Sequence, residues 1–311
     1  MISDAILKAK VFVWGCTFGS FNKFCNFLKL RFFPEKIIEE KWMREMGYPL
    51  DWNHPRDLNE KIQWLLVNSD TREWSKLADK IAVRDYIREK GLGDLLIPLY
   101  GVWKKADDVD FESLPNVFVL KCNHDSGSSM VIDKSKKPDW NKIRNIFNAK
   151  LKVDYGASGE LHYSRIRPRI LAEKRIGPDS VQMDNPPIDY KVWCFNGKAY
   201  YIWTCYGRSL NAVYTNVFDR NWILHLEYSQ VAGHYKVGDG RIPRPITLDQ
   251  MLDAAEKLSV GFPEVRIDFY EVDGKLYFGE MTFTSMCGMM KCYSPEFLNE
   301  LGGLVQLKDV Q

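Results

Sequence analysis

The stretch Val265-Arg-Ile-Asp-Phe-Tyr-Glu-Val-Asp-Gly-Lys-Leu-Tyr-Phe-Gly-Glu-Met-Thr282 decides how the chain is interpreted. Apolar residues run along both halves, and the pair Asp273-Gly274 separates them. The pattern predicts two strands, Val265 to Val272 and Lys275 to Met281, joined by a hairpin. A charge inside such a strand costs several kcal/mol unless it is paired or binds a ligand. The charged side chains that this rule singles out are Arg266, Asp268 and Glu280.

The turn of this hairpin determines whether the charges share a face of the sheet. A two-residue turn at Asp273-Gly274 would set Asp268 opposite Gly279 and turn Glu280 to the other face. A three-residue loop, Val272 to Gly274 with the glycine left-handed, would bring both carboxylates and the arginine together. We predict the three-residue loop, and with it a site for a divalent metal that bridges phosphate oxygens. The alternative is a salt-bridge ladder on the surface.

Other charges also lie in extended stretches. Lys121 lies near the end of the strand Val117 to Cys122, which runs into a small polar loop, Asn123 to Ser129. Such a loop can close over phosphates through its backbone amides, although ordinary turn chemistry explains it equally well. It is not a P-loop, because no Gly-Lys-Ser/Thr follows. Taken singly, the remaining charges are typical of solvent-facing strand positions: Glu173 in the run Ile170 to Ile176, and Asp189 with Lys191 in the next run.

Helices and hairpins alternate along the rest of the chain. Capping-box spacing opens two helices, at Asp57 and at Thr247, and Gly91 is suited to end another. Asn196-Gly197 is a strong hairpin signal. The pattern indicates an α+β or α/β protein with mixed sheets. The expected helices cover about 57–66, 79–90, 140–151 and 247–259, and the further strands are Tyr190 to Phe195 and Ala199 to Tyr206.

Composition limits the class of protein. The 311 residues, 45% hydrophobic and 27% charged, are typical of a soluble chain of two or three lobes. A net charge of +2, from 43 basic and 41 acidic residues, disfavours nucleic acid as a partner. The 7 cysteines are odd in number and contain no Cys-x-x-Cys pair, which indicates reduced thiols in the cytoplasm. We expect no cleavable signal peptide.

Residues 10–36 form an aromatic segment interleaved with Lys23, Lys29 and Arg31. Its longest uncharged run, 11–22, is too short to span a bilayer, which needs about 20 apolar residues. The segment suits peripheral contact with a membrane interface. The alternative, which we favour, is a helix packed on the protein's own core or on a second subunit.

The order of the charged positions resembles that of the ATP-contact residues in the ATP-grasp superfamily. Several phrases between about Asn59 and Gly288 are similar, more narrowly, to the TupA-like ATP-grasp family, named for teichuronopeptide biosynthesis. The match rests on six phrases in the right order: Leu58-Asn-Glu-Lys-Ile-Gln-Trp64, Leu77-Ala-Asp-Lys80, Leu96-Ile-Pro-Leu-Tyr-Gly-Val-Trp103, Phe118-Val-Leu-Lys-Cys-Asn-His124, Asp189-Tyr-Lys-Val-Trp-Cys-Phe-Asn-Gly197 and Gly279-Glu-Met-Thr-Phe283.

This resemblance implies an ATP-grasp fold that holds the nucleotide between a lid lobe and a C-terminal lobe. The implied division is an N-terminal segment 1–50, an N-terminal lobe 51–115, a lid lobe 116–172 and a C-terminal lobe 173–311. Lysines would neutralise the phosphates under a polar flap, and a hinge with a glutamate would meet the adenine or ribose. The ATP-binding residues so implied are Lys80, Lys121, Asn123, His124, Ser126, Gly127, Ser128, Glu173, Lys174, Ile176, Asp189 and Lys191.

The resemblance also implies a Mg²⁺ site and a catalytic pair. Asp268 and Glu280 would bind the metal, and Arg266, with Lys191, would steady the charge of the reacting groups. The third metal position, commonly asparagine in the superfamily, is Thr282 here, a neutral oxygen ligand of weaker affinity. A second Mg²⁺ is therefore less expected than the first.

The implied activity is that of a ligase, which activates a carboxylate as an acyl phosphate and joins it to an amine with release of ADP. The family name suggests a uronic-acid carboxylate of a capsule or other surface polysaccharide, with an amino acid or small amino alcohol as the amine. Such an enzyme would act in the cytoplasm, with an association with the inner face of the membrane as a further hypothesis. The stretch Cys287 to Lys291 is a candidate lining of the acceptor pocket.

The rival reading is a glycosyltransferase with Asp108-Val-Asp110 as its metal motif, although this motif resembles a polar loop. A non-catalytic scaffold explains less. Among the scattered histidines only His124 lies in a proposed site, and it either helps to close the flap or is an ordinary loop histidine. Three arginines suit either an anionic substrate or a solvated face, which we favour: Arg165, Arg167 and Arg169.

Overall fold

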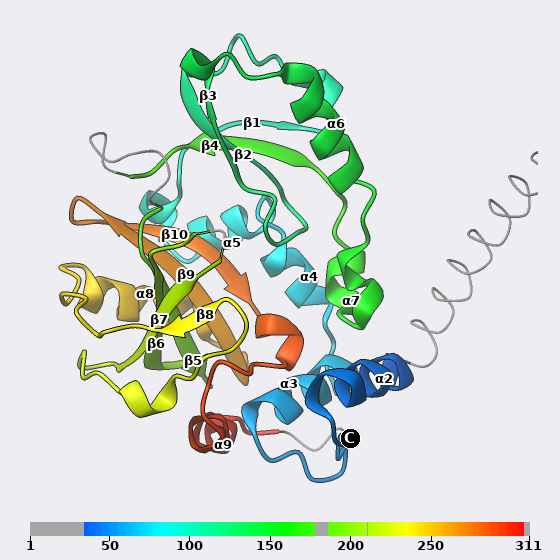
Figure 1. Ribbon diagram of the computed structural model, residues 1–311, viewed down its shortest axis with the longest axis vertical. Coiled ribbons are helices and arrows are strands. Elements are labelled where there is room, and N and C mark those ends of the chain that lie inside the picture. Colours follow the sequence, from blue (N-terminus) through cyan, green and yellow to red (C-terminus); the bar gives the residue numbers. More distant parts are fainter. Residues whose placement is uncertain (1–33, 178–185, 210, 308–311) are drawn as a thin grey trace, which may run out of the picture.

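The computed structural model of the chain describes residues 34–177, 186–209 and 211–307. These residues form two sheets, one of four strands and one of six, with helices packed around them (Figure 1). The combination confirms the predicted α+β class. Residues 10–33 of the aromatic segment lie outside the described part. Within that part, no helix is long and apolar enough to cross a membrane.

Most of the helices and strands that were predicted are found close to their expected bounds, and further helices and strands were not predicted. The helices of the described residues are α2 (Pro34–Met46), α3 (Leu58–Asn68), α4 (Arg72–Ala78), α5 (Val83–Glu89), α6 (Trp140–Lys150), α7 (Leu161–Ser164), α8 (Leu248–Ser259) and α9 (Pro295–Leu304). The 3-10 helices there are η1 (Gly93–Leu95), η2 (Ala106–Asp108), η3 (Lys134–Lys136), η4 (Tyr155–Ser158), η5 (Leu226–Tyr228) and η6 (Ser285–Gly288). The strands there are β1 (Leu99–Trp103), β2 (Val117–Cys122), β3 (Met130–Asp133), β4 (Ile170–Lys174), β5 (Asp189–Phe195), β6 (Lys198–Tyr206), β7 (Val213–Asp219), β8 (Tyr235–Val237), β9 (Glu264–Val272) and β10 (Lys275–Thr282).

The smaller sheet has the strand order β1-β4-β2-β3 and is antiparallel throughout. Alternation along β2 turns Phe118 and Leu120 toward α6, where they are fully buried in a core with Phe147. The smaller sheet takes its strands from more than one of the predicted segments. β1 comes from residues assigned to 51–115, and β4 crosses the expected boundary between residues 172 and 173.

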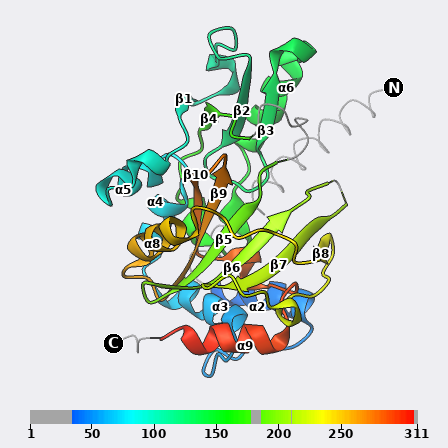
Figure 2. The ribbon, with the colours of Figure 1, turned by 90° about the vertical axis from the view of Figure 1, so that its left-hand side faces the viewer.

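The opposite face of the smaller sheet carries charged side chains among apolar ones. Cross-strand pairing sets Lys121, Leu171 and Val102 side by side on this face, and Glu173, Val119 and Val131 in the neighbouring row. Val102 and Val131 are 39% and 41% exposed, respectively. This face therefore carries apolar side chains around a lysine and a glutamate. The larger sheet lies below the smaller one in Figures 1 and 2.

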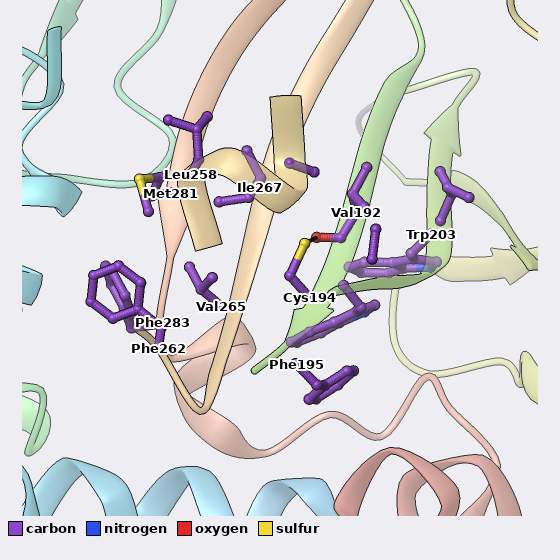
Figure 3. Packing of buried hydrophobic residues seen from close by; sticks show 14 of the residues in the cluster. Val192, Cys194, Phe195, Trp203, Leu258, Phe262, Val265, Ile267, Met281 and Phe283 are labelled. Atoms are coloured by element: carbon purple, nitrogen blue, oxygen red, sulfur yellow. Dashed lines mark hydrogen bonds between the residues drawn. The ribbon is translucent and has the colours of Figure 1, made fainter. Parts of the chain in front are cut away.

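The larger sheet has the order β10-β9-β5-β6-β7-β8, and its two faces differ in character. One face packs against α8. Leu258 of α8 lies in the same core as Val265 and Ile267 of β9 and Met281 of β10 (Figure 3). Val192 of β5 lies in the same core. The residues that alternate with these point to the other face. This second face carries the charged side chains.

Helix α5 begins four residues later than predicted, since Asp79 holds the preceding turn. Its carboxylate accepts hydrogen bonds from the backbone amide of Ile81 and from the side-chain amide of Asn123, both at 2.8 Å. Gly91 ends the helix region with φ +72°, as predicted. The capping aspartate of α3 is also confirmed, because Asp57 accepts the Glu60 amide at 2.8 Å.

Candidate functional site

The charged face of the larger sheet is built by register. Lys191 of β5 lies opposite Asp268 of β9, which in turn lies opposite Glu280 of β10. Two pairs further along, and so on the same face, Arg266 lies opposite Thr282. Directly opposed residues point to the same face. The sheet thus brings together the residues for which a metal and catalytic role was predicted.

The predicted turn of the β9–β10 hairpin is wrong, but the predicted common face is correct. Val272 pairs with Lys275, so Asp273-Gly274 is a two-residue turn, and both residues have positive φ, 51° and 68°. A β-bulge between Phe278 and Glu280 then corrects the register by one residue. The bulged residue, Gly279, returns Glu280 to the face of Asp268.

Asp268 is the centre of a buried ion-pair group. It is 2% exposed, and Arg266 donates from Nε to Oδ1 at 2.7 Å and from Nη2 to Oδ2 at 2.9 Å. Lys191 donates to Oδ2 as well. Burial would raise the pKa of Asp268, but Arg266 and Lys191 outweigh it and hold the pKa below its usual value. The carboxylate is therefore ionised at neutral pH.

The two cations of this group are stabilised in the same way. Burial lowers the pKa of Lys191, yet Asp189 and Asp268 outweigh burial and the net pKa is raised. The pKa of Arg266 is likewise raised by Asp268 against the effect of burial. Asp189 lies 3.7 Å from Lys191 and pairs with Arg208, a residue that sequence reasoning missed. Arg208 follows β6 in a loop, where nothing in the pattern indicates burial.

Glu280 is the open carboxylate of the site. Its side chain is 36% exposed, against 3% for Asp268. Its oxygens lie 3.6 Å from Lys80 Nζ, 3.7 Å from Arg266 Nη2 and 3.5 Å from the hydroxyl of Thr282. Two carboxylates and a hydroxyl are oxygen donors of the kind that Mg²⁺ prefers, so the residues fit the predicted metal. The described residues contain no group of three His, Cys, Asp or Glu side chains that fits a metal ion.

Lys80 connects the two sheets. Its Nζ donates to the carbonyl of Asp125 at 2.6 Å, and its backbone amide donates to the carbonyl of Asn123 at 3.2 Å. Both acceptors belong to the loop after β2. The same Nζ pairs with Glu280 on the larger sheet, so the predicted flap and the predicted metal site share one lysine.

The loop itself is only partly open. Asn123 is buried, and its side chain donates to the carbonyl of Arg167 and accepts from the amide of Arg169. Ser128 is also buried, and its hydroxyl accepts a hydrogen bond from the amide of Cys122 at 2.8 Å. His124 is buried edge-on to Tyr155, with ring centroids 5.3 Å apart, and burial lowers its pKa. The exposed tip consists of Ser126 and Gly127.

Glu173 lies between two cations on the smaller sheet. It pairs with Lys121 of β2 and lies 3.4 Å from Arg84 Nη1 of α5. Arg84 also donates to the carbonyl of Ile97 at 2.8 Å, which ties α5 to the sheet. Sequence reasoning missed Arg84, because its helix pattern does not show which charge turns inward. Lys174 is exposed at the end of β4, and Ile176 is half-buried beyond it.

Other candidates lie outside this group. Asp108 ends η2 and Asp110 forms a turn with the amide of Glu112, so Asp108-Val-Asp110 is a polar loop, as expected. Arg165 donates to Thr71 at 2.7 Å, and Arg169 to the neighbouring carbonyl of Pro168. Arg165 thus contacts a segment that is distant in sequence, and Arg169 contacts its neighbour.

A family model described as TupA-like ATPgrasp matches residues 60–306. The chain therefore belongs to the TupA-like ATP-grasp family, which confirms the predicted ATP-grasp fold. This finding gives no support to the glycosyltransferase alternative.

Solved structures of ligases are similar at low identity. A D-alanine–D-alanine ligase from Bacillus anthracis complexed with ATP is 14% identical, with a TM-score of 0.41, over 86% of this chain and 68% of that one. An L-amino acid ligase from Bacillus licheniformis is 12% identical, with a TM-score of 0.39, over 72% and 44%. The ATP-grasp ligase PsnB, complexed with a precursor variant, Mg and ADP, is 10% identical, with a TM-score of 0.41, over 77% and 62%. A search of curated proteins returned no significant match.

Proposed function

We propose that this ATP-grasp protein joins a carboxylate to an amine with hydrolysis of ATP to ADP and phosphate. The observation that carries the proposal is a set of cations that are each paired with a carboxylate. Lys80, Lys191 and Arg266 gather around Asp268 and Glu280, and Lys121 pairs with Glu173 on the smaller sheet. A polyphosphate and an acyl phosphate are anions that such a set can stabilise.

The nucleotide would lie between the two sheets. The face of the smaller sheet that carries Val102 and Val119 offers apolar side chains to a planar base. Glu173 lies on this face, and with Lys174 and Ile176 at the end of β4 it would contact the base or ribose. Lys121, Lys80 and Lys191 would contact phosphates, beneath the loop 123–129. Asp189 would act through Lys191, which it contacts.

Mg²⁺ would be held by Asp268 and Glu280, with Thr282 as a neutral ligand. When bound, the ion would neutralise phosphate charge and polarise the transferred group. Arg266 would hold its Asp268 partner in place and stabilise negative charge on the reacting carboxyl. Thr282 contacts both Arg266 and Glu280, at 3.2 Å and 3.5 Å, so it orients these two groups.

The substrates follow from the family name and chemistry only. We propose a uronic-acid carboxylate of a surface polysaccharide or its precursor, and an amino acid or amino alcohol as the amine. The reaction would take place in the cytoplasm, where ATP is available, with residues 10–36 as a candidate contact with the inner face of the membrane. Release of ADP with a panel of uronic acids and amines tests this level of the proposal.

Thermal unfolding tests the nucleotide site directly. Mg-ATP at about 100 times its dissociation constant stabilises a protein by about 2.7 kcal/mol, a visible shift in Tm. We expect this shift in the wild type and its loss in Glu280→Gln. Glu112→Gln, an exposed carboxylate before β2, is the matched control and keeps the shift. A response to UDP-sugars but not to Mg-ATP would overturn the proposal.

A further inference from the structure

A row of hydroxyls follows the Glu280 strand and joins the charged site to a second cluster. Thr282 and Ser285 both contact Arg266. Thr284 lies between them in sequence, and its hydroxyl donates to Glu160 Oε1 at 2.5 Å. A few residues of backbone thus separate the contacts of Arg266 from those of Glu160. The two groups of side chains are neighbours.

Glu160 is a buried carboxylate held by neutral donors. It is 8% exposed, and its second oxygen accepts from the thiol of Cys287 at 3.1 Å. Within the described residues no lysine, arginine or histidine nitrogen lies within 4.0 Å of it. Lys41 of α2 instead lies near the Cys287 thiol, whose pKa is raised by burial and by Glu160 and lowered by Lys41. A buried carboxylate without a close cation retains the capacity to take one.

Tyr163 follows Glu160 by three residues along the chain. Burial raises its pKa, and Glu160, Glu280 and Cys287 raise it further, while Arg266 opposes them. The phenol is therefore within electrostatic reach of both groups, and it is neutral at neutral pH.

The backbone that carries Cys287 is strained and clamped. Met286, Cys287 and Gly288 have φ of 49°, 57° and 64°, three consecutive left-handed residues. Gln63 of α3 donates to the carbonyls of Cys287 and Gly288 at 2.7 and 3.1 Å. Two non-glycine residues rarely adopt this conformation, so packing rather than local preference fixes the Cys287 side chain against Glu160.

We propose that Glu160, Tyr163, Thr284 and Cys287, here the Glu160 cluster, bind the amino group of the second substrate. The inference rests on the proposed ligase function and names the subsite of its amine. An ammonium group is repelled by Arg266 and by the metal, and Glu160 is the nearby carboxylate whose contacts are all neutral. Charge-assisted hydrogen bonds from an ammonium to Glu160 and to the Thr284 hydroxyl would hold the amine beside the reacting carboxyl.

Alkylation of Cys287 reports occupancy of the cluster. Among the described cysteines it is the one that is partly exposed, and the peptide that contains it can be followed by mass spectrometry. The full chain with Mg-ATP is treated with N-ethylmaleimide in the presence of glycine ethyl ester, ethanolamine or L-lysine. Acetate and propionate serve as matched carboxylates without an amine. We expect at least one amine to slow alkylation several-fold and the carboxylates to have no effect.

Variants separate the charge of Glu160 from its structural role. Glu160→Gln keeps the acceptor oxygen and should lose protection by amines, while its Tm shift with Mg-ATP stays. Thr284→Val removes one partner of the ammonium but keeps the carboxylate, and should weaken protection less than Glu160→Gln does. Equal protection of Glu160→Gln, protection by acetate, or no protection by any of the amines would overturn the proposal. Loss of the Mg-ATP shift in the wild type would instead contradict the ligase function.

Discussion

Glu280 lies opposite Asp268 because Gly279 is an extra residue between it and the hairpin turn. Without the bulge, the two-residue turn would turn the Glu280 side chain toward α8 and away from its partners. The bulge thus determines whether the β9–β10 hairpin carries a pair of carboxylates or a single one. Bulges commonly re-aim a side chain in this way.

Substitution of Gly279 therefore affects ligand binding as well as stability. A Cβ at this position would lie 3.0 Å from the Asp268 carbonyl oxygen and 3.1 Å from the ring of Tyr270. We expect Gly279→Ala to lower the free energy of unfolding by about 1–3 kcal/mol and to reduce the Tm shift with Mg-ATP. Gly303→Ala, where a Cβ meets nothing within 4 Å in a helix, should be neutral or stabilising. Urea unfolding of both variants checks this, and equal effects would contradict it.

The two sides of the Lys121–Glu173 pair should differ in their effect on stability. Glu173→Gln leaves both Lys121 and Arg84 without their carboxylate, and should cost about 3–5 kcal/mol in free energy of unfolding. Lys121→Met costs less, because Glu173 keeps Arg84 at 3.4 Å. Urea unfolding without ligand measures both. A larger cost for Lys121→Met would show that Arg84 does not stabilise Glu173.

Asp268 should make the protein sensitive to acid. Because its pKa in the folded state lies below the ordinary value of 3.8, its contribution is fully present above that pH and is lost as the pH falls through the folded-state pKa. Asp268→Asn should lose about 3–5 kcal/mol at neutral pH and lack this acid transition. Asp85→Asn, which removes an exposed pair with Arg88, should change stability by less than about 1 kcal/mol. Denaturant unfolding across pH distinguishes these outcomes.

Glu264 should make the protein less stable as the pH rises, which is opposite to the effect of Asp268. It is 1% exposed at the start of β9, neither oxygen has a hydrogen-bond partner in the described part of the chain, and burial raises its pKa well above 4.5 despite Arg266. Above that pH the unfolded state loses the proton first, so stability falls as pH rises, by up to about 1.4 kcal/mol per pH unit. Glu264→Gln should lack this fall. An unchanged pH dependence in the variant would show that Glu264 is already ionised.

The sequence predicts β5, β6, β9 and β10 of the larger sheet well, since both hairpins combine β-branched and aromatic runs with turns in which asparagine or aspartate precedes glycine. Strands β7 and β8 were not predicted. Asn196 and Gly197 have φ of 51° and 81°, as such a turn requires. The bulge at Gly279 is invisible to this pattern, because a glycine after Phe278 is equally compatible with regular pairing. A correct common face was therefore predicted through the wrong loop.

The partners of the charges were beyond sequence reasoning for a different reason. Arg84 and Glu173 are 89 residues apart, and Glu160 and Thr284 are 124 apart. Periodicity describes one element at a time, whereas such contacts depend on how distant elements pack. The order of charged residues along the chain, compared with a family, selected the candidate residues, whereas their pairing depends on the tertiary structure.

The lysines of the proposed nucleotide site already have carboxylate partners: Lys80 with Glu280, Lys121 with Glu173 and Lys191 with Asp268. An incoming triphosphate must exchange partners with these acids, which leaves Asp268 and Glu280 to share one cation, Arg266, and in need of another. A metal ion that arrives with the nucleotide supplies that cation. We therefore expect nucleotide and metal to bind with positive cooperativity, each raising the affinity of the other by the same factor.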